Sequence, residues 1–465
     1  MRTGRGLPRP VRLALRAGRP GRARTCGRIG GETQSRRNTK IARTPQSTEP
    51  KPERVVLVGL DSDASPEESL DELALLVRTA GGEVVGRIIQ RRASIDPATF
   101  LSRGKRDQAR EELMLREAQT LVFDEDLSPA QARNLEKSLK TRVIDRSELI
   151  LDIFAKRART REAMLQVELA QLEYMLPRLT KLWEHFGRLG GGIGTRGPGE
   201  TQLEVDRRRV RQRISMLKRK LVGIDREREV QQKGRRGYFR AALVGYTNAG
   251  KSTLFNALTR AEVPAEDKLF ATLDTTTRQV ALPGGRRMLL SDTVGFIRKL
   301  PHHLVASFRA TLMEVREADL IVHIVDASHP RYEEQMRTVD EVLTGLLDRA
   351  IPRLIVLNKQ DQVADETLAH AMRARHPDAV LLSALDPEDV ARLAERLGSE
   401  VAAIQSPVRV VFPTTRMGEV RQAIRGGRTV NESHLEGLVY GEYRLTPQEI
   451  DRLRKRGFEV QSIFE

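Results

Sequence analysis

The sequence predicts a mixed α/β protein made of several domains, and three observations lead to this prediction. Apolar runs of strand length alternate with segments of helical length over much of the chain. A glycine-containing loop, residues 245–252, stands between such a run and a helical segment. A long stretch of helical periodicity, residues 149–237, separates two alternating parts. At 465 residues the chain is too long for one ordinary core, which favours two to four domains.

Composition excludes a membrane-spanning protein. Hydrophobic residues make up 39% and charged residues 31%, and no apolar run approaches the roughly 18 residues that a membrane span needs. We therefore expect a cytoplasmic protein with at most a peripheral membrane association. The single cysteine, Cys26, cannot form an internal disulfide, which fits a reducing compartment.

The formal net charge of +17 indicates polyanionic partners, but the charge is unevenly distributed. Residues 1–50 hold twelve Arg and one Lys against two Glu, a net +11, which leaves +6 for the other 415 residues. The leader, residues 1–53, has no hydrophobic periodicity and is rich in Gly and Pro, a pattern typical of disorder. We favour a leader without function or a start assigned too early. A mitochondrial transit peptide and a nucleic-acid-binding arm are the alternatives.

Residues 54–148 alternate in the manner of a small parallel α/β domain. After the apolar run 55–60, Ser65 and Pro66 indicate a helix start, and Gly81 indicates its end. Further strands are expected at 83–89, 120–123 and 142–144, with helices near 104–118 and 129–140. This part has no phosphate-binding loop, so we assign no nucleotide site to it.

Residues 149–237 are expected to form two helices that pair antiparallel around a glycine-rich tip, residues 187–200. Leucines recur at three- and four-residue spacing in the first helix, from about 147 to 189. The second helix, from about 200 to 236, begins with an arginine cluster: Arg207, Arg208, Arg209, Arg211 and Arg213. A charge run alone is usually a solvated face, but beside a glycine tip it favours a nucleic-acid contact. Trp183 and Phe186 are interpreted as packing residues rather than base-stacking platforms.

A phosphate-binding loop follows the apolar strand 239–246 and opens a helix that runs through Leu258. The glycines let backbone amides turn toward phosphates, Lys251 supplies charge to the β and γ groups, and the Ser252 hydroxyl can ligate magnesium. The pattern G-x-x-x-x-G-K-S occupies Gly245, Tyr246, Thr247, Asn248, Ala249, Gly250, Lys251 and Ser252.

Two further elements follow at strand ends. Asp292, after the apolar run 288–291, can reach the magnesium shell, and after Thr293 and Val294 the amide of Gly295 is placed to sense a γ-phosphate. Asp361 can accept two hydrogen bonds from guanine N1 and the 2-amino group, which adenine does not offer. It ends a segment of four polar residues, Asn358, Lys359, Gln360 and Asp361, and the base would be backed by Ser383, Ala384 and Leu385. In this order the elements predict a P-loop GTPase domain, residues 238–405, that hydrolyses GTP.

A threonine-rich stretch precedes Asp292, and switch segments are expected at 262–278 and 292–305. A switch needs a threonine whose hydroxyl meets magnesium only when the γ-phosphate is present. The residues alone do not choose among Thr272, Thr275, Thr276 and Thr277.

The motifs resemble those of the HflX GTPases from about residue 54 to the C-terminus. The resemblance rests on residues 245–252, on Asp292 to Phe296, on the segment Phe270, Ala271, Thr272, Leu273 and Asp274, and above all on Gly-Thr-Arg-Gly-Pro-Gly-Glu-Thr-Gln-Leu-Glu at 194–204. It implies that Thr272 is the switch threonine and that Ser252 and Thr272 hold Mg²⁺. From the same resemblance, we expect Lys251, Thr272 and Gly295 to act in catalysis.

The resemblance also implies a partner and an activity. HflX proteins are expected to bind the large (50S) ribosomal subunit, its RNA and its proteins, as monomers, and to split stalled or hibernating ribosomes under stress, with the glycine tip near the peptidyl-transferase centre. An RNA-modification or ribosome-assembly GTPase and a GTP-sensing RNA-binding protein are the alternatives.

One departure from Ras-like chemistry concerns Phe296, which stands where a water-orienting glutamine would follow the glycine. Intrinsic hydrolysis should therefore be slow and completed by the ribosome, by another switch residue or by K⁺ beside a loop asparagine such as Asn248. His302 and His303 are interpreted as surface residues. The stretch 406–465, with apolar runs at 408–412 and 437–445, predicts a small C-terminal α/β module.

Overall fold

The computed structural model describes residues 52–61, 66–91, 93, 95–179, 202–233, 238–259, 269–299, 313–363, 365–424 and 427–463. The chain divides into two compact units, Met1–Asp152 and Ile153–Glu465, which are described in turn. Over the described ranges, no helix is both long and apolar enough to cross a membrane. Residues 1–51 of the leader, the glycine tip 187–200, Ser65, Trp183, Phe186, His302 and His303 lie outside these ranges.

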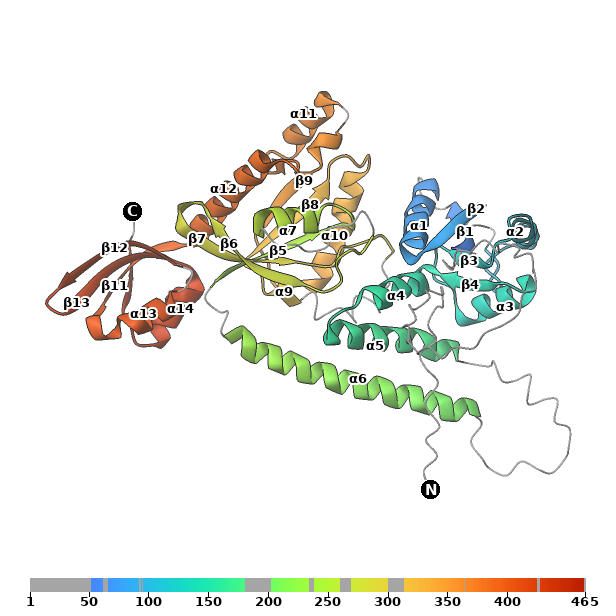
Figure 1. The fold of residues 1–465 in the computed structure, drawn as a ribbon, viewed down its shortest axis with the longest axis horizontal. Coiled ribbons are helices and arrows are strands. Elements are labelled where there is room, and N and C mark those ends of the chain that lie inside the picture. The colour runs from blue at the N-terminus through green and yellow to red at the C-terminus, as the bar shows by residue number, and fades with distance from the viewer. Residues whose placement is uncertain are drawn as a thin grey trace, which may run out of the picture. The chain divides into compact units, whose positions relative to one another are not determined.

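The first unit is built on a four-stranded parallel sheet with the strand order β2-β1-β3-β4 (Figure 1). The expected alternation of strands and helices is confirmed, and α1 ends where Gly81 adopts φ +92°. The strands are β1 (Glu53–Asp61), β2 (Gly82–Arg91), β3 (Thr120–Phe123) and β4 (Arg142–Asp145). The helices are α1 (Pro66–Ala80), α2 (Arg103–Leu115), α3 (Pro129–Leu139) and α4 (Arg146–Arg157).

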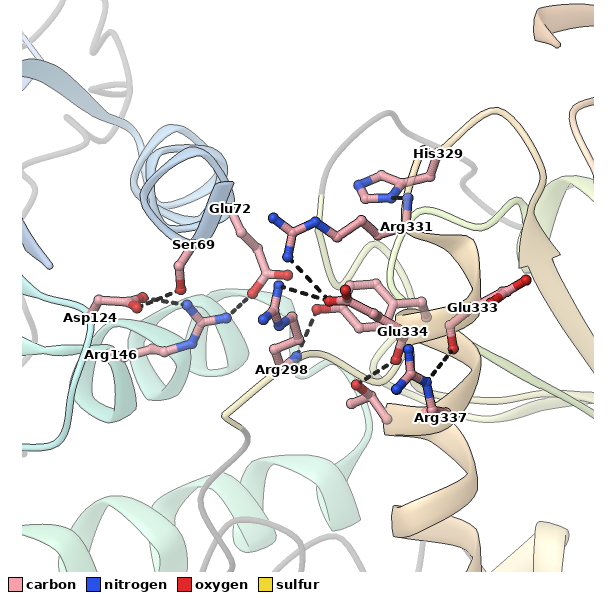
Figure 2. A network of polar contacts seen from close by, with 12 residues as sticks. Ser69, Glu72, Asp124, Arg146, Arg298, His329, Arg331, Glu333, Glu334 and Arg337 are labelled. Carbon is pink, nitrogen blue, oxygen red and sulfur yellow. Dashed lines mark hydrogen bonds and ion pairs between the residues drawn. The ribbon is translucent and has the colours of Figure 1, made fainter. Parts of the chain in front are cut away.

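A buried arginine network fixes the helices of this unit to the end of β3. Arg146 is 1% exposed, and its Nη1 donates to Asp124 Oδ1 at 2.7 Å while Nη2 donates to Glu72. Ser69 Oγ donates to the second carboxylate oxygen of Asp124 at 2.6 Å (Figure 2). A buried guanidinium needs acidic partners of this kind. The network therefore ties α1, the end of β3 and the start of α4 together.

Two helices follow in the second unit, α5 (Arg161–Arg178) and α6 (Gln202–Lys233). The expectation of one continuous helix from about residue 147 was wrong, because Thr160 caps a new helix by accepting a hydrogen bond from Ala163 N at 3.1 Å. The leucines at three- and four-residue spacing begin at Leu165, beyond this break, so their periodicity did not reveal it. The expected pairing of α5 with α6 is confirmed by the cluster of Leu169, Ile214 and Leu217.

A six-stranded sheet with the order β10-β9-β8-β5-β7-β6 forms the centre of the second unit. Its pairs are parallel except for β6 with β7, which confirms the predicted mostly parallel sheet. The strands are β5 (Phe239–Gly245), β6 (Thr276–Leu282), β7 (Arg286–Asp292), β8 (Leu320–Asp326), β9 (Arg353–Asn358) and β10 (Val380–Leu381). The helices are α7 (Lys251–Thr259), α9 (Met313–Arg316), α10 (Tyr332–Leu346), α11 (Glu366–Arg375) and α12 (Pro387–Ile404).

The C-terminal stretch folds as a four-stranded antiparallel sheet with the order β12-β13-β11-β14 and two helices. Its core contains Val408, Val410, Tyr443 and Leu445. The small α/β module is as expected, although strands β12 and β14 were not. The elements are β11 (Ser406–Pro413), α13 (Met417–Ala423), β12 (Arg428–Leu435), β13 (Leu438–Leu445), α14 (Pro447–Lys455) and β14 (Val460–Ser462).

Candidate nucleotide site

The polar motifs of the second unit meet at one edge of its six-stranded sheet. Gly245, Asp292 and Asn358 are the last residues of β5, β7 and β9, which belong to the parallel part of the sheet. Carboxyl ends of parallel strands lie at the same edge, where α/β proteins bind ligands. The topology therefore brings together motifs that lie more than 100 residues apart in the chain.

The two glycines of the phosphate-binding loop are required by close backbone approaches. A Cβ on Gly245 would overlap the carbonyl oxygen of Ile324 in the neighbouring strand β8. Gly250 has φ +91°, a conformation that side chains disfavour, and a Cβ there would overlap the side-chain amide of Asn358. Any larger residue at either position would displace the loop from the sheet.

Lys251, the first residue of α7, is 6% exposed and lies inside the loop. Its Nζ donates to the carbonyl oxygens of Gly245 at 3.1 Å and Tyr246 at 2.7 Å. Burial lowers the pKa of Lys251 from 10.5 to about 8, and the nearby Asp292 partly opposes this shift. Phosphate oxygens that enter the loop would give this ammonium group a negatively charged partner.

Ser252, Thr272 and Asp292 converge on one point beside Lys251. Ser252 Oγ donates to Asp292 Oδ2 at 2.7 Å, Thr272 Oγ1 donates to the same oxygen at 3.2 Å, and the two hydroxyl oxygens are 2.7 Å apart. Burial raises the pKa of Asp292, while its hydrogen bond from Ser252 and the charge of Lys251 oppose this. Of the four candidate threonines, Thr272 hydrogen-bonds with both Ser252 and Asp292.

These three side chains fit a magnesium ion. Oxygen donors are what this hard cation prefers, and it is commonly held by one or two protein groups together with phosphates. Among the described residues, none hydrogen-bonds to the buried Asp292 Oδ1, so this oxygen can still interact with a cation. Ser252 and Thr272 would hold the ion, with Asp292 behind them.

The segment after Asp292 is paired with the phosphate-binding loop along its backbone. Thr247 N donates to Phe296 O at 2.7 Å and Phe296 N donates to Gly245 O at 3.1 Å. Gly295 lies so close to the loop that a Cβ there would be 3.0 Å from Lys251 Nζ. The side chain of Phe296 is 2% exposed, so it packs inward and offers no group to water. Thr293 is also internal, since its Oγ1 donates to Leu243 O at 2.6 Å.

Next to this segment, a chain of polar contacts joins the loop to the start of α10. Arg298 N donates to the Tyr246 hydroxyl at 2.8 Å, and the Arg298 guanidinium lies 4.0 Å from Glu334 Oε2. Glu334 also accepts from Arg331 Nη1 at 3.2 Å (Figure 2). Tyr246, which the sequence assigned to nucleotide binding, therefore contacts the second expected switch segment through its side chain.

At the base end, Asn358 is a buried link between two loops. Its Nδ2 donates to Ala249 O and its Oδ1 accepts from Ala384 N, both at 2.9 Å. Lys359 adopts φ +64° and its Nζ pairs with Asp326 Oδ2 at 2.6 Å. Asp361 is exposed, so its carboxylate is accessible to a base.

Two adjoining hollows contain most of the predicted binding residues. Asn248, Gly250 and Thr253 line both, which makes one groove. The phosphate end is lined further by Thr247, Lys251, Ser252, Phe270, Ala271, Thr272, Thr293 and Gly295. The base end is lined further by Asn358, Lys359, Asp361, Gln362, Ser383, Ala384 and Leu385.

Other predicted residues line neither hollow: Gly245, Tyr246, Ala249, Leu273, Asp274, Asp292, Val294 and Gln360. Most of these side chains pack inside the protein behind the groove. Thr253 was missed by the sequence reasoning, although its place directly after Ser252 was a signal for it.

Asp274 and Phe270 contact α4 and α5 instead. Asp274 Oδ2 accepts from Arg159 N at 3.0 Å and from Thr160 N at 3.2 Å, and its Oδ1 accepts from Thr160 Oγ1 at 2.5 Å. The Asp274 carboxylate, expected at the nucleotide, is thus bonded to the start of α5 in this arrangement. Phe270 packs edge-to-face on Phe154, with ring centroids 4.7 Å apart.

The arginine cluster on α6 is mostly directed to solvent. Arg208, Arg209 and Arg211 are exposed. Arg213 instead makes a two-bond contact with Glu168 on α5, at 2.7 and 2.9 Å, and this hydrogen bonding raises the pKa of Arg213. Arg213 thus joins the two helices, whereas Arg208, Arg209 and Arg211 are accessible to a polyanion from solution.

Models of known protein families match most of the chain. Models described as the N-terminal and middle regions of GTP-binding GTPases match residues 67–155 and 157–235. A third model, described as a 50S ribosome-binding GTPase, matches residues 240–359.

Individual relatives agree with these matches. GTPase HflX from Caldanaerobacter subterraneus is 43% identical over 404 residues, 86% of this chain and 93% of the relative. GTPase HflX from Escherichia coli K12 is 47% identical over 345 residues, 72% of this chain and 80% of the relative. Among solved structures, a GTP-binding protein from Sulfolobus solfataricus in complex with GDP matches with 24% identity and a TM-score of 0.41, covering 74% of this chain and 99% of that chain.

Proposed function

Because this chain belongs to the HflX family of GTPases, we propose that it binds the large ribosomal subunit and, when GTP is bound, dissociates stalled or hibernating ribosomes before hydrolysing GTP to GDP and phosphate. The convergence of Ser252, Thr272 and Asp292 beside Lys251 supports the nucleotide-dependent part. The exposed arginines of α6 support the ribosome-dependent part.

In this proposal the phosphate end of the groove binds and senses the γ-phosphate. Lys251 leaves the carbonyl oxygens of Gly245 and Tyr246 for the β- and γ-phosphates, and Gly295 N donates to the γ-phosphate. Mg²⁺, when bound by Ser252 and Thr272, neutralises negative charge on the phosphates. Thr272 takes part only in the triphosphate state, which makes its segment a switch.

The base end selects guanine in this proposal. Asp361 accepts hydrogen bonds from N1 and the 2-amino group, while Asn358 holds the two flanking loops at their spacing. The buried Phe296 cannot orient water, so hydrolysis is slow without a partner. We further propose that K⁺ beside Asn248 assists it. Equal turnover in sodium and potassium salts would contradict this last point.

The proposal divides the chain into five segments: the leader 1–53, an N-terminal α/β domain 54–148, a helical hairpin 149–237, the GTPase domain 238–405 and a C-terminal module 406–465. In it the hairpin reaches ribosomal RNA and the GTPase domain controls when it does. Arg208, Arg209 and Arg211 supply the sequence-independent charge for that contact.

Sedimentation of the full chain with purified ribosomes tests the proposal. The protein should migrate with large subunits in a non-hydrolysable GTP analogue, and separated subunits should accumulate from 70S particles. It should leave the ribosome in GDP. Binding that is indifferent to nucleotide would instead support a GTP-sensing RNA-binding protein, and binding only to precursor subunits or tRNA would support an assembly or modification GTPase.

A charge-reversal pair tests the RNA-facing part. Arg208→Glu with Arg211→Glu should weaken ribosome binding and make the remaining binding less dependent on salt, because fewer phosphates are neutralised, while GTP affinity remains unchanged. Arg337→Glu, an exposed arginine on α10, is the matched control. GTP turnover that does not rise with added ribosomes in the unaltered protein would count against the whole proposal.

A further inference from the structure

The segment that carries Thr272 is held on both sides by residues outside the six-stranded sheet and its helices. Phe270 and Asp274, two residues before and two residues after Thr272, both contact the α4–α5 turn. A span of two residues is at most about 7 Å long. The positions of these two anchors therefore restrict where the Thr272 hydroxyl can lie.

The anchor at Asp274 is a set of three hydrogen bonds at the start of a helix. Its carboxylate accepts from the backbone amides of Arg159 and Thr160 and from the Thr160 hydroxyl, at 3.0, 3.2 and 2.5 Å. These donors lie at the N-terminal end of α5, where backbone amides are unpaired and the helix dipole favours a negative charge. A carboxylate is the side chain that fits this position best.

The anchor at Phe270 is apolar. Its ring meets Phe154 edge-to-face with an interplanar angle of 78°, and the two rings are 2% and 1% exposed. Phe270 also has φ +56°, an unusual conformation for a residue with a large side chain. The surroundings of the ring must therefore hold this backbone geometry in place.

Capping of α5 does not require Asp274. Thr160 Oγ1 already accepts a hydrogen bond from Ala163 N at 3.1 Å, the usual role of a capping threonine. Asp274 adds a contact across 114 residues of sequence to a helix that is already capped. Because Thr160 is exposed, water can replace this contact, so it can form and break as the switch segment moves.

We propose that Asp274 is a positioning residue that couples the start of α5 to the switch threonine Thr272. In one and the same arrangement Asp274 is bound to Thr160 and Thr272 is bound to Ser252 and Asp292, so the two contacts are compatible with each other. This inference rests on the proposed role of Thr272. By linkage, a γ-phosphate that holds Thr272 stabilises the start of α5, and anything that displaces α5 releases Thr272.

Nucleotide titration of the full chain tests the coupling in one direction. Asp274→Ala should lower the affinity for a non-hydrolysable GTP analogue by about 5- to 20-fold, within the range of ordinary coupling energies, and leave GDP affinity within about twofold. Thr160→Ala should act similarly and Thr160→Ser should restore the affinity, because serine keeps the donating hydroxyl. Ser128→Ala, which removes the cap of α3, is the matched control and should change neither affinity.

Hydrogen exchange tests the coupling in the other direction, independently of affinity. The amides of Arg159 and Thr160 should exchange more slowly with the GTP analogue than with GDP in the unaltered protein. This difference should disappear in both Asp274→Ala and Thr272→Ala.

The outcomes separate the coupling from the role of Thr272 on which it rests. If Thr272→Ala lowers analogue and GDP affinity equally, the switch role of Thr272 in the proposed function is wrong. If Thr272→Ala is selective for the analogue but Asp274→Ala changes neither affinity nor exchange, the coupling alone is overturned. Equal losses for both nucleotides in Asp274→Ala would also overturn it, since that result indicates a loss of folding.

Discussion

The two ends of the nucleotide groove differ in how deeply their side chains are buried. At the phosphate end, Lys251, Asp292 and Thr293 are 6%, 0% and 0% exposed, and each is bonded to another part of the sheet edge. At the base end, Asp361 is exposed and Leu385 is 74% exposed. Substitutions at the phosphate end should therefore alter chemistry and folding together, whereas those at exposed positions of the base end should alter nucleotide binding with little effect on folding.

Asn358 is where the two ends meet. It is 2% exposed, and its side-chain amide bonds the phosphate-binding loop at Ala249 and the base loop at Ala384. A residue usually described as part of base recognition is thus, by its contacts, a structural bridge.

The largest effect is expected at the phosphate end. Lys251→Ala should lower single-turnover GTP hydrolysis by about 100- to 1,000-fold, because it removes a preorganised cation from the phosphates. Lys455→Ala, an exposed lysine on α14 that pairs with Asp451, is the control. Turnover within tenfold of the unaltered protein would show that Lys251 does not act on the phosphates.

At the base end, Asp361→Asn should lower GTP affinity by about 10- to 100-fold, the value of hydrogen bonds to a charged group. Affinity for xanthosine triphosphate should rise, because an asparagine amide can donate to the oxygen at C2 of xanthine. The free energy of unfolding should stay within ~0.5 kcal/mol, as for other exposed positions. A large loss of stability would remove the distinction between the two ends.

Nucleotide affinity should depend on pH because of a group at the phosphate end of the groove. The pKa of Lys251 is about 8 in the folded chain and 10.5 ordinarily, and phosphates favour its charged form. Affinity for a GTP analogue should therefore fall about tenfold between pH 7 and pH 9, with proton uptake visible by calorimetry in buffers of different ionisation enthalpy.

The same shift has a consequence for stability without nucleotide. Between pH 8 and 10.5 the unfolded chain holds the Lys251 proton more strongly than the folded chain does, so the contribution of Lys251 to the free energy of unfolding rises with pH in this window. Lys251→Arg should lose both pH dependences. If the variant keeps them, another group causes them.

The smallest effect is expected for Leu385→Ala at the base end. Because the Leu385 side chain is 74% exposed, its loss should change the free energy of unfolding by less than ~0.5 kcal/mol. Affinity for GTP should fall only about twofold, since little apolar surface is removed from contact. Thermal unfolding and nucleotide titration measure the two quantities. A marked loss of stability would show that Leu385 packs against the rest of the protein.

Much of the site was predictable because its motifs are contiguous. Gly245 to Ser252, Asp292 to Gly295 and Asn358 to Asp361 each follow a strand, and strands with parallel order bring their ends to one edge. The fold class followed from the alternation of strands and helices. The break at Thr160 was not predictable from leucine spacing, because a cap is a local backbone event that the apolar pattern does not record.

The sequence by itself determined the fold class and many of the residues that line the nucleotide groove, because local propensity and motif spacing specify them. Only the tertiary structure supplied the contacts of Thr272 with Ser252 and Asp292, turned Phe296 and Thr293 inward, and joined Asp274 to Thr160. These outcomes depend on which surfaces pack together across more than 100 residues of chain. Hydrogen bonds and close packing act over a few ångströms in space, whatever the separation in sequence.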